Sequence, residues 1–134
     1  MSEENLERLR AGYAAWNRAD LTGFLEFMAS TNVFYTSGIF PSHDSVYRGH
    51  DGIRKFWETF HDAWERLDIT VSRFEDLGND QVLALINFEA VGRGSGVEVR
   101  RKFAHLLTFD EGLVIEVRAY ADWDAALEAA RLSE

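Results

Sequence analysis

His105 is the residue whose type and position best suit chemistry in this chain. It lies within residues 99–109, where alternate side chains fall on opposite faces of an expected strand. Its own face is mostly apolar and consists of Val99, Arg101, Phe103, His105, Leu107 and Phe109. An imidazole with an unperturbed pKa of ~6.5 can give or take a proton at neutral pH, and apolar surroundings favour its neutral form. His105 is therefore either an acid/base group at the bottom of a pocket or a hydrogen-bonded core histidine.

Three further side chains could act with this imidazole as catalytic groups. Asp122 could orient His105 in a His/Asp pair, but it directly precedes an expected helix, and N-capping is the favoured interpretation. The hydroxyls of Tyr13 and Tyr35 could donate hydrogen bonds to a carbonyl oxygen and stabilise an enolate. Aromatic residues at such positions usually belong to a core, so both interpretations of the tyrosines stay open.

The chain has enough aromatic surface to line a pocket for a flat apolar ligand. The expected binding residues are Trp16, Phe27, Phe40, Trp57, Phe60, Phe88, Phe103 and Trp123. The same rings would also suffice to fill a core. Arg101 shares the inward face of His105, where it could bind a carboxylate or phosphate at the pocket rim or extend into water. The interpretation in which the Arg101 side chain extends into water is favoured.

Several function classes are disfavoured by what the sequence lacks. A formal net charge of −9 leaves no basic surface for nucleic acid or for an anionic membrane. The chain has no cysteine, and His43, His50 and His61 are too far apart in the expected elements to predict a shared metal ion. Residues 92–96 are typical of a hairpin tip and not of a phosphate-binding loop. We expect no metal and no cofactor.

Length and composition are those of a small globular protein. A chain of 134 residues predicts one domain over residues 1–134, and 46% hydrophobic residues suffice for a substantial core. The acidic N-terminus carries no apolar signal segment, and no stretch reads as a membrane span. A cytoplasmic protein is therefore expected.

The first half of the sequence has helical periodicity. An amphipathic helix over residues 6–16 is followed by Asp20, which is placed to cap a second helix carrying the apolar residues of 21–28. A short strand is expected over residues 33–36. Residues 37–49 are expected to form an irregular loop, which is typical of a lid or mouth. A third helix, amphipathic and aromatic, follows over residues 50–64.

The second half alternates with a period of two. Four strands are expected over residues 67–77, 81–91, 98–109 and 113–120, joined by hairpin turns into an antiparallel meander, and a terminal helix closes the chain. One face of this sheet is apolar and must be covered. The sequence therefore predicts an α+β fold in which three N-terminal helices wrap a curved antiparallel sheet and form a conical pocket.

Four short motifs, in their order and spacing, carry a family resemblance. They are residues 13–21 (YAAWNRADL), 47–53 (YRGHDGI) leading into Phe56 and Trp57, 102–109 (KFAHLLTF) and 120–123 (YADW). Over nearly its full length the chain resembles the nuclear transport factor 2-like superfamily, and within it the SnoaL-like polyketide cyclases and relatives of ketosteroid isomerase. The resemblance implies the conical fold but no single reaction, because the superfamily hosts isomerases, cyclases, dehydratases, hydrolases and non-catalytic binders.

The resemblance also implies roles for individual residues. His105 falls where ketosteroid isomerases place an acidic hydrogen-bond donor and where SnoaL-like cyclases have a functional histidine, which implies that it faces the cavity. Tyr13 lies within one position of the isomerase oxyanion tyrosine. Thr36 stands where the isomerases have their general base, so an authentic ketosteroid isomerase is not expected. Asp122 corresponds loosely to a cyclase aspartate near the end of the last strand.

Two function classes follow from these observations. In the first, the pocket is an active site in which His105 moves protons on a polyketide-, steroid- or terpenoid-like compound, as a cofactor-independent isomerase, cyclase or dehydratase. In the second, the same fold is a non-catalytic ligand-binding or dimerisation module. We expect a homodimer, as the resemblance also implies, through an outer sheet face of complementary charge that carries Asn87, Glu89, Arg100, Lys102, Glu116 and Arg118.

Overall fold

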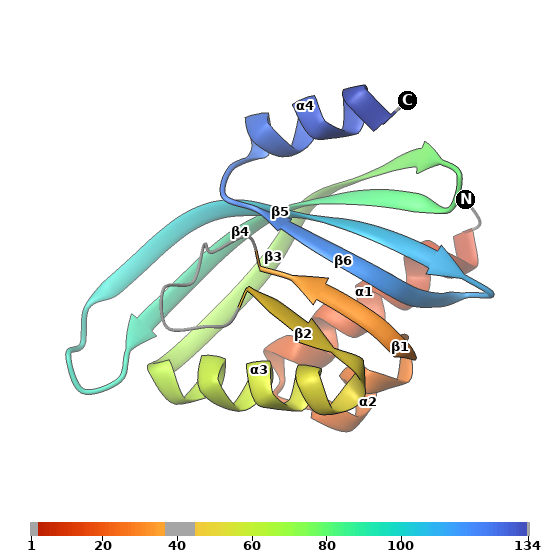
Figure 1. Ribbon diagram of the computed structural model, residues 1–134. Coiled ribbons are helices and arrows are strands. Elements are labelled where there is room, and N and C mark those ends of the chain that lie inside the picture. The colour runs from red at the N-terminus through yellow and green to blue at the C-terminus, as the bar shows by residue number, and fades with distance from the viewer. Residues whose placement is uncertain (1–2, 37–44, 134) are drawn as a thin grey trace.

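The computed structural model describes residues 3–36 and 45–133. The first elements are α1 (Glu3–Asn17), α2 (Leu21–Glu26), β1 (Met28–Tyr35), β2 (Val46–Arg48) and α3 (Gly49–Ala63). The remainder consists of β3 (Trp64–Gly78), β4 (Gln81–Gly92), β5 (Glu98–Asp110), β6 (Leu113–Tyr120) and α4 (Trp123–Ser133). The strands assemble into one curved sheet with helices on both sides (Figure 1). This arrangement confirms the predicted α+β fold.

The sheet has the strand order β2-β1-β6-β5-β4-β3. The antiparallel pairs β3–β4, β4–β5 and β5–β6 confirm the predicted meander. β1 pairs in parallel with β6 and antiparallel with β2, so the sheet is mixed at this edge. The register between β3 and β4 shifts at several places, and such bulges increase the twist of a strand pair. The long strands therefore curve around whatever packs on their inner face.

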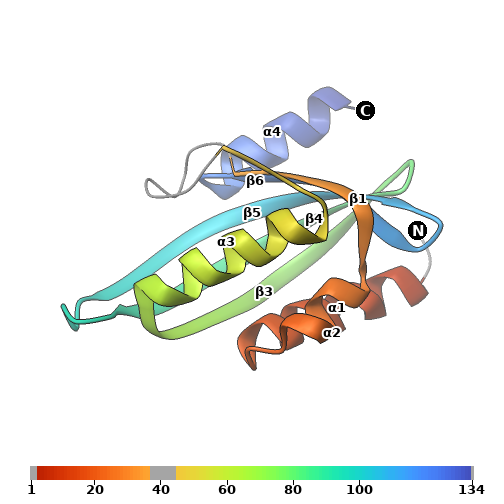
Figure 2. The same ribbon diagram turned by 60° about the horizontal axis from the view of Figure 1, so that its bottom comes forward.

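The helices cover the two faces of the sheet unequally. α1, α2 and α3 lie against one face, and α4 lies across the other (Figures 1 and 2). The larger core fills the space between the first three helices and the sheet. A smaller core beneath α4 is formed by Leu83, Leu85, Ala104, Leu106, Ala126 and Ala130. Within the described residues, no helix is both long and apolar enough to cross a lipid bilayer.

Two tight turns connect the first pair and the last pair of strands in the meander. Asn79 and Asp80, between β3 and β4, have φ angles of 53° and 62°. Glu111 and Gly112, between β5 and β6, have φ angles of 50° and 82°. Positive φ at both central residues is the conformation of a type I′ turn, whose twist matches that of the flanking strands. The turn at Glu111 and Gly112 therefore sets the register between β6 and β5, the strand of His105.

The helical hairpin differs from the prediction at its C-terminal end. Oδ1 of Asp20 accepts a hydrogen bond from the backbone N–H of Gly23 at 3.0 Å, which confirms the expected cap of α2. However, α2 ends at Glu26, so Phe27 and Met28 do not belong to it. Met28 begins β1, which is longer than the expected strand over residues 33–36. An apolar run of this length fits a helix or a buried strand, and periodicity alone does not separate them.

Two other boundaries differ from the prediction. The three-residue strand β2 lies within the segment expected to be a loop, and residues 37–44 of that loop lie outside the described residues. Trp64, expected to end the third helix, has φ −122° and ψ 130° and begins β3 instead. Its ring still packs against Phe60 and Phe88, so the helical spacing of aromatic residues continues past the end of the helix itself.

Candidate functional site

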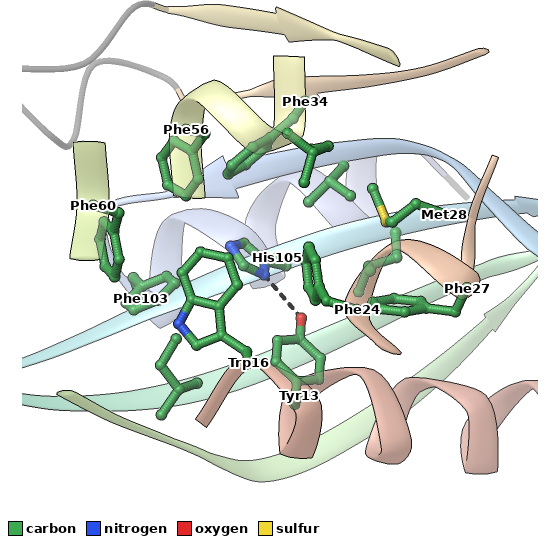
Figure 3. Close-up of a pocket in the computed structure, with 14 residues that line it drawn as sticks. Tyr13, Trp16, Phe24, Phe27, Met28, Phe34, Phe56, Phe60, Phe103 and His105 are labelled. Atoms are coloured by element: carbon green, nitrogen blue, oxygen red, sulfur yellow. Dashed lines mark hydrogen bonds between the residues drawn. The ribbon is translucent and has the colours of Figure 1, made fainter. Parts of the chain in front are cut away.

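A small apolar pocket lies between the inner face of the sheet and the first three helices (Figure 3). Its cavity has a volume of about 50 Å³. The described lining consists of Tyr13, Trp16, Phe24, Phe27, Met28, Phe34, Ile53, Phe56, Phe60, Ile69, Phe103, His105, Leu107 and Val117. Of these side chains, only those of Tyr13, Trp16 and His105 carry nitrogen or oxygen atoms. The described lining is therefore hydrophobic, with nitrogen and oxygen atoms on three side chains.

Tyr13 and His105 are joined by a hydrogen bond across the pocket wall. The distance between Oη of Tyr13 and Nδ1 of His105 is 2.8 Å (Figure 3). Tyr13 is held on the buried side of α1, and its ring also packs against Phe74 on β3. The prediction that His105 shares a face with Phe103 and Leu107 agrees with the structure, because all three line the pocket.

Small neighbours in the sheet give the imidazole its room. His105 is paired in register with Ala84 on β4 and with Ala119 on β6, and both alanines are fully buried. Cross-strand neighbours on one face lie close enough to touch, so larger side chains there would compete with the imidazole for space. His105 is thus larger than either of the residues paired with it on the neighbouring strands.

Burial controls the protonation of the hydrogen-bonded pair. Removal from water lowers the pKa of His105 from 6.5 to about 3, because the imidazolium ion is poorly solvated there. The same loss of water raises the pKa of the Tyr13 hydroxyl. The described lining contains no Asp, Glu, Lys or Arg that could compensate a charge. Both groups are therefore neutral at pH 7.

The second ring nitrogen of His105 opens onto the pocket. Within the described chain, Nδ1 is the imidazole nitrogen that has a hydrogen-bond partner. The described side-chain atoms that are both sealed and unpaired are Nε1 of Trp16 and Oδ1 of Asn32, and Nε2 of His105 is not among them. The side chain of His105 is also only half-buried although it lies deep in the fold. A ligand in the pocket can therefore reach Nε2.

Only part of the predicted binding set lines the pocket. Trp16, Phe27, Phe60 and Phe103 do. Trp57 and Phe88 pack one layer behind: the Trp57 ring lies 4.7 Å from that of Trp16, and the Phe88 ring lies 5.8 Å from that of Phe60. These two residues support the walls and do not form them. Phe40 lies outside the described residues.

Two of the expected pocket residues lie on the opposite face of the sheet. Tyr35 follows the inward-facing Phe34 on β1, and its ring packs beneath the Arg118 guanidinium at 4.2 Å. Trp123 packs with the smaller core under α4, where its Nε1 donates to the carbonyl oxygens of Phe103 and Ile86 at 3.0 and 3.2 Å. Their placement differs from the prediction because side chains alternate along β1 and because α4 turns back over the outer face.

Asp122 and Arg101 also lie away from the pocket lining. Oδ1 of Asp122 accepts a hydrogen bond from the backbone N–H of Ala125 at 2.7 Å, so the carboxylate caps α4, as the favoured interpretation proposed. The Asp122 side chain is exposed, and the described partner of the His105 imidazole is Tyr13 instead. Arg101 is exposed as well. Neither side chain is among the described pocket residues.

Sequence reasoning missed several residues of the lining. These are Phe24, Met28, Phe34, Ile53, Phe56, Ile69, Leu107 and Val117. The spacing of Ile53, Phe56 and Phe60 on α3 is a helical stripe that could have placed all three together. Phe34 and not Tyr35 faces the pocket, and the sequence did not reveal this because it did not show where β1 begins.

In the portion of the chain that the structure covers, no three His, Cys, Asp or Glu side chains gather into a group that could hold a metal ion. His50 and His61 are separately engaged. Nε2 of His50 bonds the carbonyl oxygen of Met28 at 2.8 Å, and Nδ1 of His61 bonds that of Trp57 at 3.0 Å. The described histidines other than His105 therefore stabilise the termini and faces of helices.

The fold and the pocket define a class of α+β proteins in which helices close an apolar pocket over one face of a curved sheet. The chain belongs to the SnoaL-like domain family, which matches residues 9–117. This membership confirms the resemblance seen in the sequence motifs. A comparison with curated proteins finds no match.

Solved structures show the same fold at low sequence identity. TerC, co-crystallised with polyporic acid, has a TM-score of 0.81 and 21% identity, over 96% of this chain and 99% of TerC. A protein from Jannaschia sp. CCS1, provisionally assigned as a SnoaL-like polyketide cyclase, has a TM-score of 0.76 and 19% identity, over 97% and 95% of the chains.

A third similar structure is that of a hypothetical protein from Catenulispora acidiphila DSM 44928. It has a ketosteroid isomerase-like fold and is in complex with trimethylamine. Its TM-score is 0.76 and its identity 16%, over 93% of this chain and 92% of the other. These likenesses show the fold of the chain.

Proposed function

We propose that this protein binds a compact, largely apolar polyketide- or terpenoid-like molecule and moves a proton on it, as a cofactor-independent isomerase, cyclase or dehydratase. The observation that carries the proposal is the neutral Tyr13–His105 pair at the wall of an otherwise apolar pocket. The presence of small molecules in the TerC and Catenulispora structures supports a ligand in the equivalent fold. A whole steroid nucleus exceeds a cavity of about 50 Å³, so smaller substrates are favoured.

His105 is the catalytic residue in this proposal. Its Nε2 faces the pocket, where it can contact a carbonyl or hydroxyl oxygen of the substrate. As negative charge develops on that oxygen, a hydrogen bond in water-poor surroundings stabilises it more than it stabilises the neutral oxygen. Tyr13 is a positioning residue, because its hydroxyl holds Nδ1 and so fixes the plane of the ring.

The lining also limits the reaction. No carboxylate among the described pocket residues could act as a base. Because Nε2 of His105 donates its hydrogen to the substrate oxygen, the carbon-bound proton passes to a water molecule, a weak base, and His105 stabilises the resulting enolate. The substrates that fit best are those whose C–H bond is already acidic, such as carbon between two carbonyl groups, since a weak base suffices there. Cyclisation and dehydration of polyketide-like chains involve such carbon atoms.

Exchange of carbon-bound hydrogen tests this proposal without knowledge of the natural substrate. Ethyl acetoacetate in D2O would be followed by NMR with wild type, His105→Gln and the surface control Asp122→Asn. We expect protein-dependent acceleration of exchange at the carbon between the two carbonyls, lost in His105→Gln and kept in Asp122→Asn. Exchange that is equally fast in His105→Gln would overturn the catalytic role of His105.

A non-catalytic binding protein is the second candidate. The observation that favours it is the strongly lowered pKa of His105, which leaves little imidazolium for acid catalysis at neutral pH. A thermal-shift screen of polyketide-, terpenoid- and steroid-like compounds on wild type and His105→Gln separates the two. A ligand at a hundred times its Kd stabilises by about 2.7 kcal/mol. Stabilisation without any hydrogen exchange or turnover would favour the binding protein.

A homodimer and a cytoplasmic location stay predictions. α4 covers part of the outer face through which dimerisation was expected. Some charges of that face have partners within the chain: Arg118 pairs with Glu116 at 3.3 Å, and Lys102 lies 4.6 Å from the Trp123 ring. The remaining surface over β4 and β5 carries Glu89 and Arg100, which are mostly exposed and lie 3.9 Å from each other. A monomeric mass at micromolar concentration would contradict the homodimer.

A further inference from the structure

We propose that the pocket recognises its ligand with two N–H donors, Nε2 of His105 and Nε1 of Trp16, and so selects a compact uncharged ring compound with two acceptor oxygens. Trp16 is then a specificity-determining residue. The inference rests on the proposed function for the location of the binding site, but not for catalysis. It identifies the class of ligand as a small ring dicarbonyl.

The first donor follows from the hydrogens of the Tyr13–His105 pair. Nδ1 of His105 either accepts the Tyr13 hydroxyl hydrogen or donates its own hydrogen to Oη. In the second case the buried hydroxyl hydrogen would have no acceptor in the described chain, because His105 is the hydrogen-bond partner of Tyr13 there. Buried donors are paired in native proteins with few exceptions. The imidazole therefore carries its proton on Nε2, and this N–H points into the pocket.

The second donor is the indole N–H of Trp16. Trp16 lines the pocket and is 5% exposed, and its Nε1 is sealed and has no partner in the described chain, so a ligand reaches it only by moving a neighbouring ring. Its neighbours are rings of Phe24, Phe56, Trp57, Phe60 and His61, with centroids 4.7–5.9 Å away. By contrast, Nε1 of Trp123 donates to two carbonyl oxygens. An unpaired buried N–H is unfavourable, so an acceptor oxygen that displaces an apolar neighbour gains the missing bond.

The described lining has no charged side chain to compensate an ionic ligand, which makes binding of such a ligand to these residues unfavourable. A carboxylate in this pocket would lose its hydration without meeting a cation, and a burial of that kind is costly. An ammonium ion would find aromatic faces, but it would also meet two N–H donors with positive hydrogens. A neutral acceptor pairs with both donors and leaves no charge unpaired.

The cavity volume limits the ligand to about one ring. The cavity of about 50 Å³ is small, so it accepts a compact ligand and not a fused ring system. Flat rings of phenylalanine, tyrosine and tryptophan form most of its walls (Figure 3). A six-membered ring with carbonyl groups at opposite ends therefore fits both the shape and the donors.

The test uses a series of probes with almost the same shape. Cyclohexane-1,4-dione has two carbonyl groups, cyclohexanone has one, and methylenecyclohexane has none. Cyclohexanecarboxylate and trimethylamine provide an anion and a cation. Affinities would be measured by NMR titration on wild type, Trp16→Phe and the control Trp57→Phe, which alters the layer behind Trp16 and not the described lining.

The indole N–H signals of 15N-labelled protein give a direct readout. We expect the signal that disappears in Trp16→Phe to move downfield when the dione binds, while the Trp123 signal stays in place. Trp16→Phe should weaken dione binding roughly 2- to 10-fold, as expected for one hydrogen bond, and leave methylenecyclohexane unchanged. Trp57→Phe should keep the preference for the dione.

Several results would overturn the inference. These are a dione that binds without moving the Trp16 signal, an equal loss of all probes in Trp16→Phe, tighter binding of the carboxylate or trimethylamine, or no binding of any probe at millimolar concentration. Failure of the catalytic proposal looks different. In that case the dione would bind through Trp16, but no variant-dependent hydrogen exchange would be detected on ethyl acetoacetate.

Discussion

Oη of Tyr13 on α1 lies 2.8 Å from Nδ1 of His105 on β5, although 92 positions separate the two residues in the sequence. The bond connects the helical layer to the centre of the sheet within an apolar pocket. It therefore links three properties that can be measured separately: the stability of the fold, the protonation of the imidazole and the chemistry of the pocket.

Tyr13→Phe should destabilise the protein and lower any His105-dependent activity. The change removes the hydroxyl and leaves Nδ1 of His105 unpaired, which costs about 1–3 kcal/mol for a buried group. Urea unfolding would measure the loss. Tyr35→Phe is the matched control, because Tyr35 lies outside the described lining, and a change within about 0.5 kcal/mol is expected there. Equal losses in both variants would contradict a special role of the Tyr13 hydroxyl.

The stability of the protein should fall as the pH falls below the ordinary pKa of histidine. His105 has a pKa of about 3 in the folded chain and 6.5 as its reference value, so the unfolded chain binds more protons between these limits. The stability that comes from keeping His105 neutral is fully present above pH 6.5. The free energy of unfolding then decreases as the pH drops toward 3, by up to about 1.4 kcal/mol per pH unit.

Urea unfolding at about pH 7.5 and about pH 5.5 would measure this dependence. His105→Gln should reduce the slope of the free energy of unfolding against pH. His61→Gln is measured beside it, because the pKa of His61 is also lowered, mainly by burial, and this variant removes that contribution. The carboxyl groups of Asp20 and Asp76 have pKa values lowered from 3.8 by hydrogen bonds from backbone N–H groups, and they titrate below this window. An unchanged slope in His105→Gln would show that the imidazole is not buried in its neutral form.

Gly12→Ala should destabilise the protein although alanine favours helices. A methyl group at this position of α1 would overlap the ring of Phe27, which lines the pocket. Overpacking of this kind costs about 1–3 kcal/mol, more than the ~1 kcal/mol that alanine gains over glycine in a helix. Thermal unfolding would measure the net change. The second change Phe27→Leu should restore part of the stability of Gly12→Ala, and a failure to do so would contradict the proposed clash.

Asp122→Ala should lower stability by about 1 kcal/mol, because α4 loses its N-cap. α4 lies on the face of the sheet opposite to α1, α2 and α3 (Figure 1), and Asp122 is outside the described pocket lining, so binding of cyclohexane-1,4-dione should remain within twofold of wild type. Urea unfolding and the NMR titration measure the two quantities. A large loss of binding with little loss of stability would instead support a functional role for this carboxylate.

The sequence predicted the sheet better than the helical hairpin. Alternation over a long strand with a type I′ turn at its C-terminal end leaves one register, and this determined the face of His105. The apolar run through Phe27 and Met28 has no such constraint. Its division between helix and strand depends on tertiary packing, in particular on the close approach of Phe27 to Gly12.

The candidate site was predictable in its centre and not at its edges. His105 and Tyr13 could be proposed from residue type and face, but their hydrogen bond depends on how α1 crosses the sheet. The placement of Trp123 on the outer face could not be deduced, because a terminal helix can pack on either side. Its two carbonyl acceptors become available only where α4 folds back over β4 and β5.

The parallel pair of β1 and β6 has a consequence for how the protein is made. β1 is among the first elements to leave the ribosome, yet its neighbour β6 is the last strand of the chain. Contacts of such long sequence separation form late and slow the search for the native state. β1 therefore lacks its parallel neighbour until translation is nearly complete, a period in which chaperones would have the most to protect.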